Sequence, residues 1–333
     1  MRRFIAATLA ASLATAAFAA TPAAAPFVAS PYKHLTQHRP EAGNVITVNP
    51  EGKPMPWLAL PGRTAALTWA FANGECGDEL WDGRPGQAVA DANVAAFAKA
   101  GAGYIVSTGG QGGVFTCASD AGMERFVQRY LSPQLLGFDF DIEENQTPAQ
   151  IASLARRVAA VQKKYPRLRF SFTIATHAAS DGSRRSLNTT GEAVLQALRA
   201  SNVRDYLLNL MVMDYGPTAP GVCVVKEGHC DMAASALQAA RNVHEKYGVP
   251  YAQIELTPMI GINDVVENVF TPADGEALAR AVREQGMAGL HWWSVDRDTP
   301  CTRPVTGADA QCHTMPGVPA GAFGRAMGKA AAR

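Results

Sequence analysis

The stretch 135–146, LLGFDFDIEENQ, alternates apolar and acidic residues. Successive side chains of a strand point to opposite faces, so Asp139, Asp141 and Glu143 share one face. The other face carries Leu136, Phe138, Phe140 and Ile142. Such an apolar face packs against helices, and the acidic face then points into the interior of a closed barrel. At about 3.3 Å of rise per residue, the three acids ascend the barrel, with Glu143 at the mouth.

Strand-like runs recur along the chain, at 27–35, 65–71, 103–108, 135–143, 169–176, 206–215, 254–261 and 289–295. Helical patterns occur between them, at 89–101, 148–165, 191–201, 232–248 and 274–286. Alternating strands and helices indicate βαβ units with a parallel sheet, and eight such units predict one (β/α)8 TIM barrel. A doubly wound open sheet is the alternative, but no glycine-rich phosphate loop follows the first strand.

Caps and breaks support these boundaries. Thr147 followed by Pro148 predicts a helix start, and Thr271 with Asp274 predicts another. The segment 36–64 is rich in proline and glycine and lacks a helical period, which predicts a long loop with a small hairpin. We expect a short closing helix in the C-terminal tail.

The N-terminal residues 1–19 are typical of an export signal. Arg2 and Arg3 precede an apolar run that ends in small residues at the cleavage positions. We therefore expect a secreted protein, extracellular or periplasmic, whose residues 20–333 form one catalytic domain and act as a monomer. The formal net charge is +1, and without a lysine and arginine cluster, nucleic acid and membranes are unfavoured partners.

Six cysteines in an exported chain predict disulfide bonds. Short separations favour the pairs Cys223–Cys230 and Cys301–Cys312, and Cys76–Cys117 follows by elimination. The alternative is a zinc site, which is disfavoured because no CxxC motif occurs and the histidines are scattered. We expect no metal and no cofactor.

Three carboxyl groups that point into a barrel cannot all ionise cheaply. Burial and mutual repulsion raise at least one pKa, and a carboxyl that keeps its proton near neutral pH can act as a general acid. Two other interpretations remain open: a solvated acidic face on a half-exposed strand, and a metal-binding acidic strand. The second lacks the calcium-loop pattern and supporting histidines.

The run GFDFDIE resembles the DGxDxDxE signature of family 18 glycoside hydrolases, the chitinases, with Leu136 at the first Asp position. Three further motifs agree in order: 107–110 with SxGG, 213–216 with MxYD, and 289–293 with GxMxW. Gly216 stands where the family usually has Asp. The segments 257–264 and 293–298 are similar to the bacterial single-barrel subgroup. The resemblance covers roughly residues 27–330 and implies the TIM barrel.

This resemblance implies a role for each acid. Glu143 is the proton donor to the glycosidic oxygen, and the substrate's own N-acetyl oxygen attacks the sugar carbon. Asp141 bonds the acetamido N–H and offsets the positive charge, while Asp139 shares a proton or a hydrogen bond with Asp141. This mechanism is an exception to the two-carboxylate scheme of most glycosidases.

The same resemblance implies the rest of the site. Tyr215 directs its hydroxyl at the acetamido carbonyl, Trp293 forms the apolar floor beneath the reacting sugar, and Met213 lines the pocket. Asp214 is a further candidate, because the departure at Gly216 leaves open whether Asp214 takes over part of the missing Asp's role.

The function expected is hydrolysis of β-1,4 N-acetylglucosamine linkages in chitin or chito-oligosaccharides, with retention of configuration. The first alternative is an endo-β-N-acetylglucosaminidase that acts on glycans. The second is an inactive chitin-binding lectin on the same barrel. Such lectins usually lack the acidic Glu, and Glu143 is present here.

Overall fold

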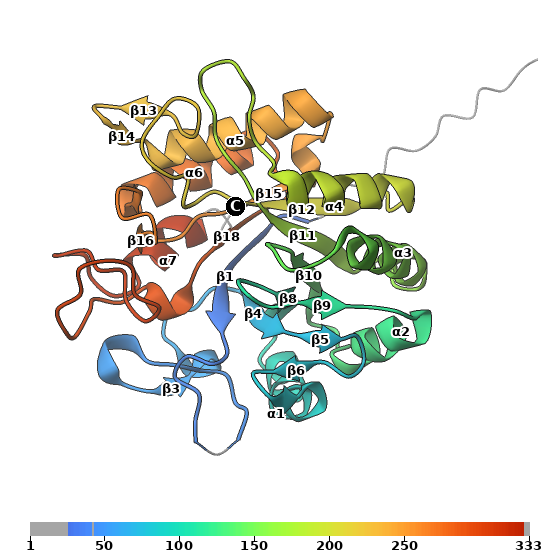
Figure 1. Cartoon of the computed structure of the whole chain (residues 1–333). Helices are drawn as coiled ribbons and strands as arrows, with labels where there is room; N and C mark the ends of the chain where they lie inside the picture. The colour runs from blue at the N-terminus through green and yellow to red at the C-terminus, as the bar shows by residue number, and fades with distance from the viewer. Residues whose placement is uncertain (1–25, 42, 330–333) are drawn as a thin grey trace, which may run out of the picture.

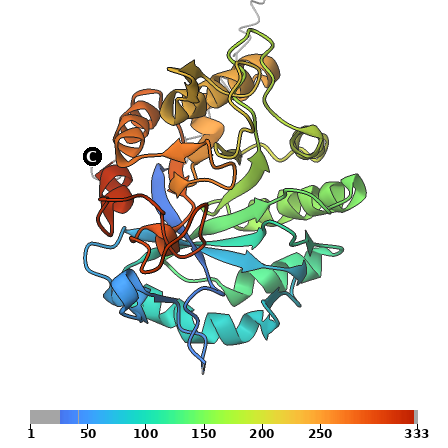
Figure 2. The same ribbon diagram turned by 60° about the vertical axis from the view of Figure 1, so that its left-hand side comes forward.

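The chain folds into a closed barrel of eight parallel strands, as the strand and helix pattern predicts (Figures 1 and 2). The computed structural model describes residues 26–41 and 43–329, so the predicted export signal lies outside the described residues. The strands are β1 (Val28–His34), β4 (Ala66–Ala72), β8 (Gly103–Gly109), β10 (Leu135–Asp141), β11 (Arg169–Ala175), β12 (Tyr206–Met211), β15 (Ile254–Thr257) and β18 (Gly289–Trp292). Each strand pairs with its neighbour in chain order, and β18 closes the barrel on β1.

Helices surround the barrel (Figure 1). They are α1 (Gly86–Lys99), α2 (Asp120–Arg129), α3 (Pro148–Lys164), α4 (Thr189–Ala200), α5 (Met232–Tyr247), α6 (Pro272–Glu284) and α7 (Ala322–Gly328). The sequence prediction omitted α2, which is short and polar apart from one buried face. No helix in the described ranges is long and apolar enough to cross a bilayer.

The described residues of the connection from β1 to β4 form no α-helix, as expected for 36–64. It contains the antiparallel pair β2 (Thr47–Val48) and β3 (Met55–Pro56), with a 3₁₀ turn after each strand. Trp57 from this connection is fully buried and stacks on Phe97 of α1, with ring centroids 5.4 Å apart. An aromatic anchor thus covers the side of the barrel where the first helix would lie.

The predicted caps are present. Thr147 accepts a hydrogen bond from the backbone N–H of Gln150, whose side chain bonds back to Thr147 N, and Thr271 forms the same capping box with Asp274. Each box satisfies two backbone donors that the first helical turn leaves free. These two boxes fix the starts of α3 and α6.

Strand β10 shows the predicted alternation. Phe138 and Phe140 are fully buried outside the barrel, with ring centroids 4.9 Å from Phe126 and 6.0 Å from Phe115. On the inner face, a Cβ atom at Gly137 would lie 2.1 Å from the backbone oxygen of Arg169. Only glycine fits there, so the first small residue of GFDFDIE leaves room for the neighbouring strand.

Three strands end at least three residues before their predicted ends, and one of them is β18, which ends at Trp292 rather than at 295. Strand β12 ends at Met211 because Asp214 and Gly216 have left-handed φ angles of 48° and 97°, which an extended strand does not allow. Strand β15 ends at Thr257 and leads to the antiparallel pair β16 (Gly261–Ile262) and β17 (Val269–Phe270). We call residues 259–270 the β16–β17 hairpin.

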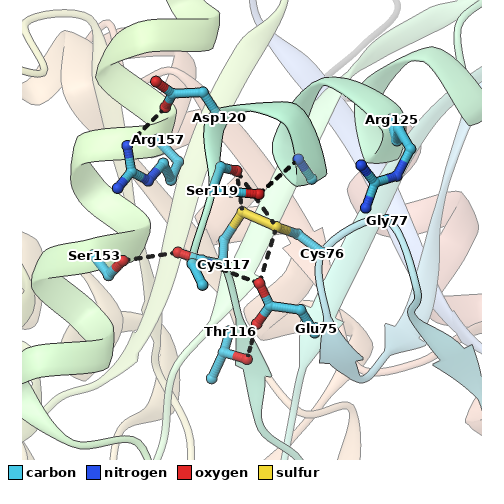
Figure 3. The surroundings of a disulfide bond; sticks show 12 residues. Glu75, Cys76, Gly77, Thr116, Cys117, Ser119, Asp120, Arg125, Ser153 and Arg157 are labelled. Atoms are coloured by element: carbon cyan, nitrogen blue, oxygen red, sulfur yellow. Dashed lines mark hydrogen bonds and ion pairs between the residues drawn. A yellow bond between two sulfur atoms is a disulfide. The ribbon is translucent and has the colours of Figure 1, made fainter.

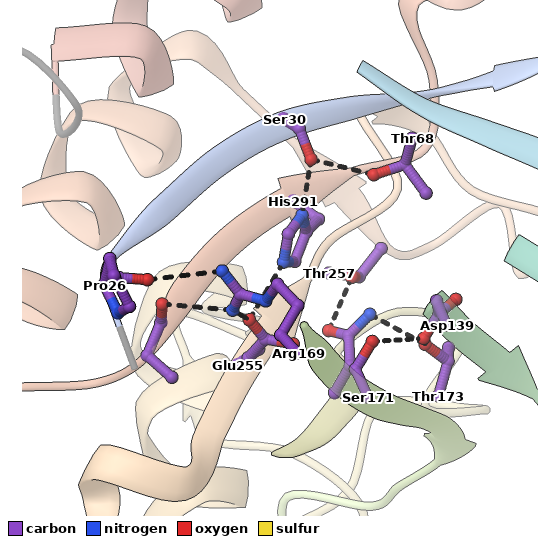
Figure 4. Close-up of polar contacts among 12 residues, drawn as sticks. Pro26, Ser30, Thr68, Asp139, Arg169, Ser171, Thr173, Glu255, Thr257 and His291 are labelled. Atoms are coloured by element: carbon purple, nitrogen blue, oxygen red, sulfur yellow. Dashed lines mark hydrogen bonds and ion pairs between the residues drawn. The ribbon is translucent and has the colours of Figure 1, made fainter. Parts of the chain in front are cut away.

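The N-terminal pole of the barrel holds a buried ionic cluster (Figure 4). The guanidinium of Arg169 contacts the Glu255 carboxylate, and His291 Nε2 lies 3.3 Å from the same carboxylate oxygen. His291 Nδ1 is 2.8 Å from the Ser30 hydroxyl. Burial of these charges is tolerated because they are paired and hydrogen-bonded. Together they fill the floor of the barrel at its N-terminal pole.

The three predicted disulfides, Cys76–Cys117, Cys223–Cys230 and Cys301–Cys312, are all present. Cys76–Cys117 joins the loops that follow β4 and β8, next to the short parallel pair β5 (Gly74–Glu75) and β9 (Phe115–Thr116). Figure 3 shows the Glu75 carboxylate beside this bond, where it accepts from the Thr116 hydroxyl at 2.6 Å. Glu75 and both sulfur atoms lie close enough to ligate a metal, but the two sulfurs are bonded to each other.

Candidate active site

The three acids of β10 ascend the barrel in the predicted order of burial. Asp139 is 1 % exposed, Asp141 is 5 % exposed, and Glu143, two residues beyond the end of the strand, is half-buried. The deepest acid therefore lies farthest from water, and Glu143 lies at the C-terminal mouth. This pole is where TIM-barrel enzymes carry their active sites.

Asp139 lies within a cradle of hydroxyl groups. Its carboxylate accepts four hydrogen bonds, from Ser107 (2.6 Å), Thr173 (2.7 Å), Ser171 (2.8 Å) and Tyr32 (2.9 Å). Figure 4 shows Ser171 and Thr173 beside it. Burial raises the pKa of Asp139, and the four hydroxyls oppose that rise by stabilising the anion.

The expected proton or hydrogen bond between Asp139 and Asp141 does not occur among the described contacts. Both oxygens of Asp139 are already engaged by hydroxyl groups. The two acids instead act on each other through space, since the charge on Asp139 contributes to raising the pKa of Asp141.

Asp141 is buried, and its side chain makes no hydrogen bond among the described residues. Its Oδ1 atom has no hydrogen-bond partner in the described part of the chain. Burial first, and then repulsion from Glu143 and Asp139, raises the pKa of Asp141 well above its ordinary value. A buried, unpartnered acceptor is costly, so this oxygen suits a donor supplied by a ligand.

Glu143 has the properties of a general acid. Burial, followed by repulsion from Glu144 and Asp214, raises its pKa to about 7. A carboxyl with this pKa keeps its proton at mildly acidic pH and can lose and regain it during turnover.

We predict that activity declines above the pKa of Glu143. The reacting form is protonated, so kcat/KM should fall by about tenfold per pH unit above pH 7, and a pH profile of kcat/KM on a soluble oligosaccharide measures this. Glu144→Gln removes one repelling charge, so it should move the decline to lower pH. A decline centred near 4.5, the ordinary value for Glu, would contradict the assignment.

In the segment after β12, Asp214 interacts electrostatically with Glu143, whereas the Tyr215 hydroxyl does not interact with the acids. Asp214 is half-buried, and its charge helps to raise the pKa of Glu143. Tyr215 is 2 % exposed, its hydroxyl has no partner among the described residues, and burial alone raises its pKa. The prediction that Tyr215 lies on a strand was wrong, because the turn begins before it. Its proposed contact with an acetamido group stays a prediction.

Met213 is half-buried in the same segment. Its place in the pocket lining stays a prediction. Asp214 is held by the β16–β17 hairpin: its Oδ1 accepts from the backbone N–H of Val265 at 2.8 Å. Burial raises the pKa of Asp214, and this hydrogen bond opposes the rise. Asp214 therefore has a fixed position at the edge of the acid row.

Trp293 follows β18 and lines a cavity of about 380 Å³, whose lining includes none of the acids Asp139, Asp141 and Glu143. It stacks on Phe71, with ring centroids 5.6 Å apart and planes at 14°, and His34 and Tyr32 lie against the same indole. Gly109 connects the cavity to the acids, because its Cα packs against the backbone oxygen of Asp141, where a Cβ would come within 2.0 Å. The indole is thus half-buried at a mouth that is partly apolar and partly polar.

Several residues of the site were missed by the sequence prediction. Tyr32 reaches across the barrel to Asp139, and Asn209 donates to Tyr32 at 2.9 Å and to Thr173 at 2.8 Å. Ser171 and Thr173 alternate along β11 as the acids do along β10, which is the signal that could have identified them. For Tyr32 the sequence holds no such signal, because only closure of the barrel brings β1 opposite β10.

The comparisons with known proteins agree with this geometry. Over 223 residues, 62 % of this chain, it is 27 % identical to the probable bifunctional chitinase/lysozyme of Escherichia coli and, likewise, to endochitinase 11 of Metarhizium anisopliae. The catalytic domain of the chitinase from Pyrococcus furiosus superposes with a TM-score of 0.70 at 23 % identity, covering 94 % of this chain and 98 % of that one.

The chain is a chitinase homologue. The resemblance described from its motifs is thereby confirmed, and the Pyrococcus structure confirms the TIM barrel. The matched region spans 24 % of the length of the Escherichia coli relative and 42 % of the Metarhizium one. No model of a known protein family matches the chain.

Proposed function

We propose that this chitinase homologue hydrolyses β-1,4 linkages between N-acetylglucosamine units in chitin or chito-oligosaccharides. The observation that carries the proposal is the pair of unlike carboxyls at the mouth: Glu143 with a pKa near 7, and Asp141 buried beneath it with an unpartnered oxygen. The first can give a proton to a leaving oxygen. The second can accept a hydrogen bond from an amide N–H and stabilise a cation.

The proposed reaction is substrate-assisted. Glu143 donates its proton to the glycosidic oxygen as the bond to C1 breaks, and the N-acetyl carbonyl oxygen forms a new bond to C1 on the opposite face. Asp141 accepts the acetamido N–H and offsets the positive charge of the resulting oxazolinium ring. Water then attacks C1 as the bond from C1 to the acetamido oxygen breaks and the N-acetyl group re-forms. Ionised Glu143 takes the water's proton, and the second inversion restores the original configuration.

The cavity lined by Phe71 and Trp293 supports binding of a sugar chain. Its volume of about 380 Å³ falls in the range of small-ligand pockets, and it combines the stacked rings of Phe71 and Trp293 with polar groups such as Asn73. Oδ1 of Asn73 is buried and has no partner in the described ranges. Aromatic rings suit the CH faces of sugars, and a free amide oxygen suits their hydroxyl groups.

We also propose that the protein works outside the cytosol. Its three disulfides support this, since such bonds persist in oxidising compartments. The Lys and Arg count of 30 against 29 Asp and Glu supports a neutral polysaccharide rather than a polyanion as the partner.

The experiment is product analysis on defined substrates. Chito-oligosaccharides and an N-glycosylated protein are incubated with the full chain, and the products are separated by chromatography while NMR follows the anomer formed first. Cleavage of the oligosaccharides with the β-anomer dominant supports the proposal. Release of glycan from the glycoprotein alone would replace it with the endoglycosidase alternative, and a dominant α-anomer would rule out attack by the N-acetyl group.

A further inference from the structure

Arg297 is buried in the segment that follows the C-terminal end of β18, and it has no place in the proposed reaction. It lies in the 3₁₀ turn η4 (Val295–Arg297), within the segment 293–298, and is 1 % exposed. Its guanidinium donates to three backbone carbonyls: Ile260 (2.9 Å from Nη2), Ile262 (2.6 Å) and Asp309 (2.5 Å). It makes no ion pair with a described carboxylate. A buried charge is tolerated when hydrogen bonds surround it, and here they all come from the chain backbone.

Two of those carbonyls belong to the β16–β17 hairpin. Other groups of this hairpin bind the segment after β12. Val265 N donates to Asp214 Oδ1 at 2.8 Å, and Asn268 Oδ1 accepts from Tyr215 N at 2.8 Å. The backbone N–H of Asp214 also points at Asn263 Oδ1, at 3.4 Å. The hairpin that positions Asp214 is therefore the same one whose carbonyls bind Arg297.

The same hairpin binds the backbone of Trp293, whose indole lines the cavity. Ile260, whose carbonyl binds Arg297, donates its own N–H to the backbone oxygen of Trp293 at 3.0 Å. Trp293 N in turn donates to Pro258 O at 2.9 Å. The Arg297 guanidinium is thus linked through one peptide segment to Asp214, which lies beside Glu143, and to Trp293, the proposed floor beneath the reacting sugar.

We propose that Arg297 is a positioning residue, which sets the place of Asp214 beside Glu143 and of Trp293 in the cavity by clamping the β16–β17 hairpin. The proposal rests on the proposed function and goes beyond it. It also gives the segments 257–264 and 293–298 a shared function. The first supplies the carbonyls of Ile260 and Ile262, and the second supplies the guanidinium of Arg297 that binds them. Arg297 touches no reacting atom and acts only through its neighbours.

The charges around these groups determine the expected pH effect. Asp214 faces Glu143, Asp264 and Arg297; Glu143 faces Glu144, Asp214 and Asp141; and Arg297 faces Asp264, Asp214 and Asp309. Ionised Asp214 raises the pKa of Glu143, and the charge of Arg297 opposes the rise that burial causes in the pKa of Asp214. Loosening the hairpin lets Asp214 move away from Glu143 and weakens the repulsion on it, so Glu143 loses its proton at lower pH.

The test compares Arg297→Met, which keeps the length but removes the charge and the donors, with Arg297→Lys, which keeps the charge but not the fork. The pH profile of kcat/KM on a soluble chito-oligosaccharide is measured for each, together with kcat and KM. A misplaced reacting geometry can cost about 10²-fold, so Arg297→Met should lose about that much kcat and show its alkaline decline at lower pH. Arg297→Lys should lose kcat with a smaller shift of the decline.

The matched control is Arg303→Met, on the loop closed by Cys301–Cys312. Arg303 is exposed and pairs with the Asp309 side chain, so its loss should leave both kcat and the pH profile unchanged. Folded Arg297 variants with the wild-type kcat and alkaline decline would overturn the inference. If Arg297→Met does not fold, Arg297→Lys decides by the same two readouts. An inactive wild type would instead refute the proposed function.

Discussion

Glu143→Gln should abolish turnover while leaving oligosaccharide binding intact. The amide has nearly the shape of the acid but carries no transferable proton, and general acid catalysis is worth about 10²–10⁴-fold. The loss should reach the upper end of that range, because the leaving group is a sugar hydroxyl that departs poorly without protonation. Rates on a chito-oligosaccharide measure the first part, and calorimetric titration with the same oligosaccharide measures the second.

The control for this prediction is the adjacent residue. Glu144→Gln removes an exposed carboxylate one position along the chain, so below the alkaline decline it should keep the wild-type rate. If Glu143→Gln retained most of the activity, another group would have to supply the proton. If it lost binding together with turnover, Glu143 would be holding the substrate rather than protonating it.

Asp141→Asn should cause the second largest loss, with Glu143 still present. The amide can face the acetamido group but carries no charge, so the cation formed in the reaction loses its partner in a buried, water-poor site. Removing one such stabilising group typically costs about 10²–10³-fold in kcat. Single-turnover rates measure this loss, and a thiazoline that mimics the cationic ring should also bind the variant more weakly.

A control removes the same charge at the other pole. Asp205→Asn, on the exposed turn before β12, changes the net charge equally but lies at the N-terminal end of the barrel, so it should not alter the rate. The assignment of Asp141 fails if its variant loses less rate than the Tyr215→Phe variant, whose effect should not exceed that of one hydrogen bond.

Much of the fold follows from local patterns. The alternation in β10 predicts both the outer phenylalanines and the inward acids, because successive side chains of a strand point to opposite faces. The capping boxes at Thr147 and Thr271 predict the starts of two helices for an equally local reason. The short helix α2 was missed although Met123, Phe126 and Val127 have helical spacing, because the helix is only ten residues long and otherwise polar.

The site was predictable only where its geometry is local. Asp139, Asp141 and Glu143 share one strand and its end, so their order of depth follows from the sequence. Tyr215 was assigned to a strand because YLLNLMVMDY has the composition of one, whereas the left-handed backbone at Asp214 ends it early. In the hydroxyl cradle of Asp139, Ser107, Ser171 and Thr173 lie on the two strands that pair with β10, whereas only closure of the barrel brings Tyr32 of β1 to it.

The position of Pro26 has a practical consequence. Its carbonyl accepts from Arg169 at 3.2 Å in the floor of the barrel (Figure 4), so the described chain begins at the pole opposite the acids. A tag or surface linkage attached just before Pro26 would leave the mouth facing away from the support. Immobilised this way, the protein should present its cleft to insoluble particles as freely as it does in solution.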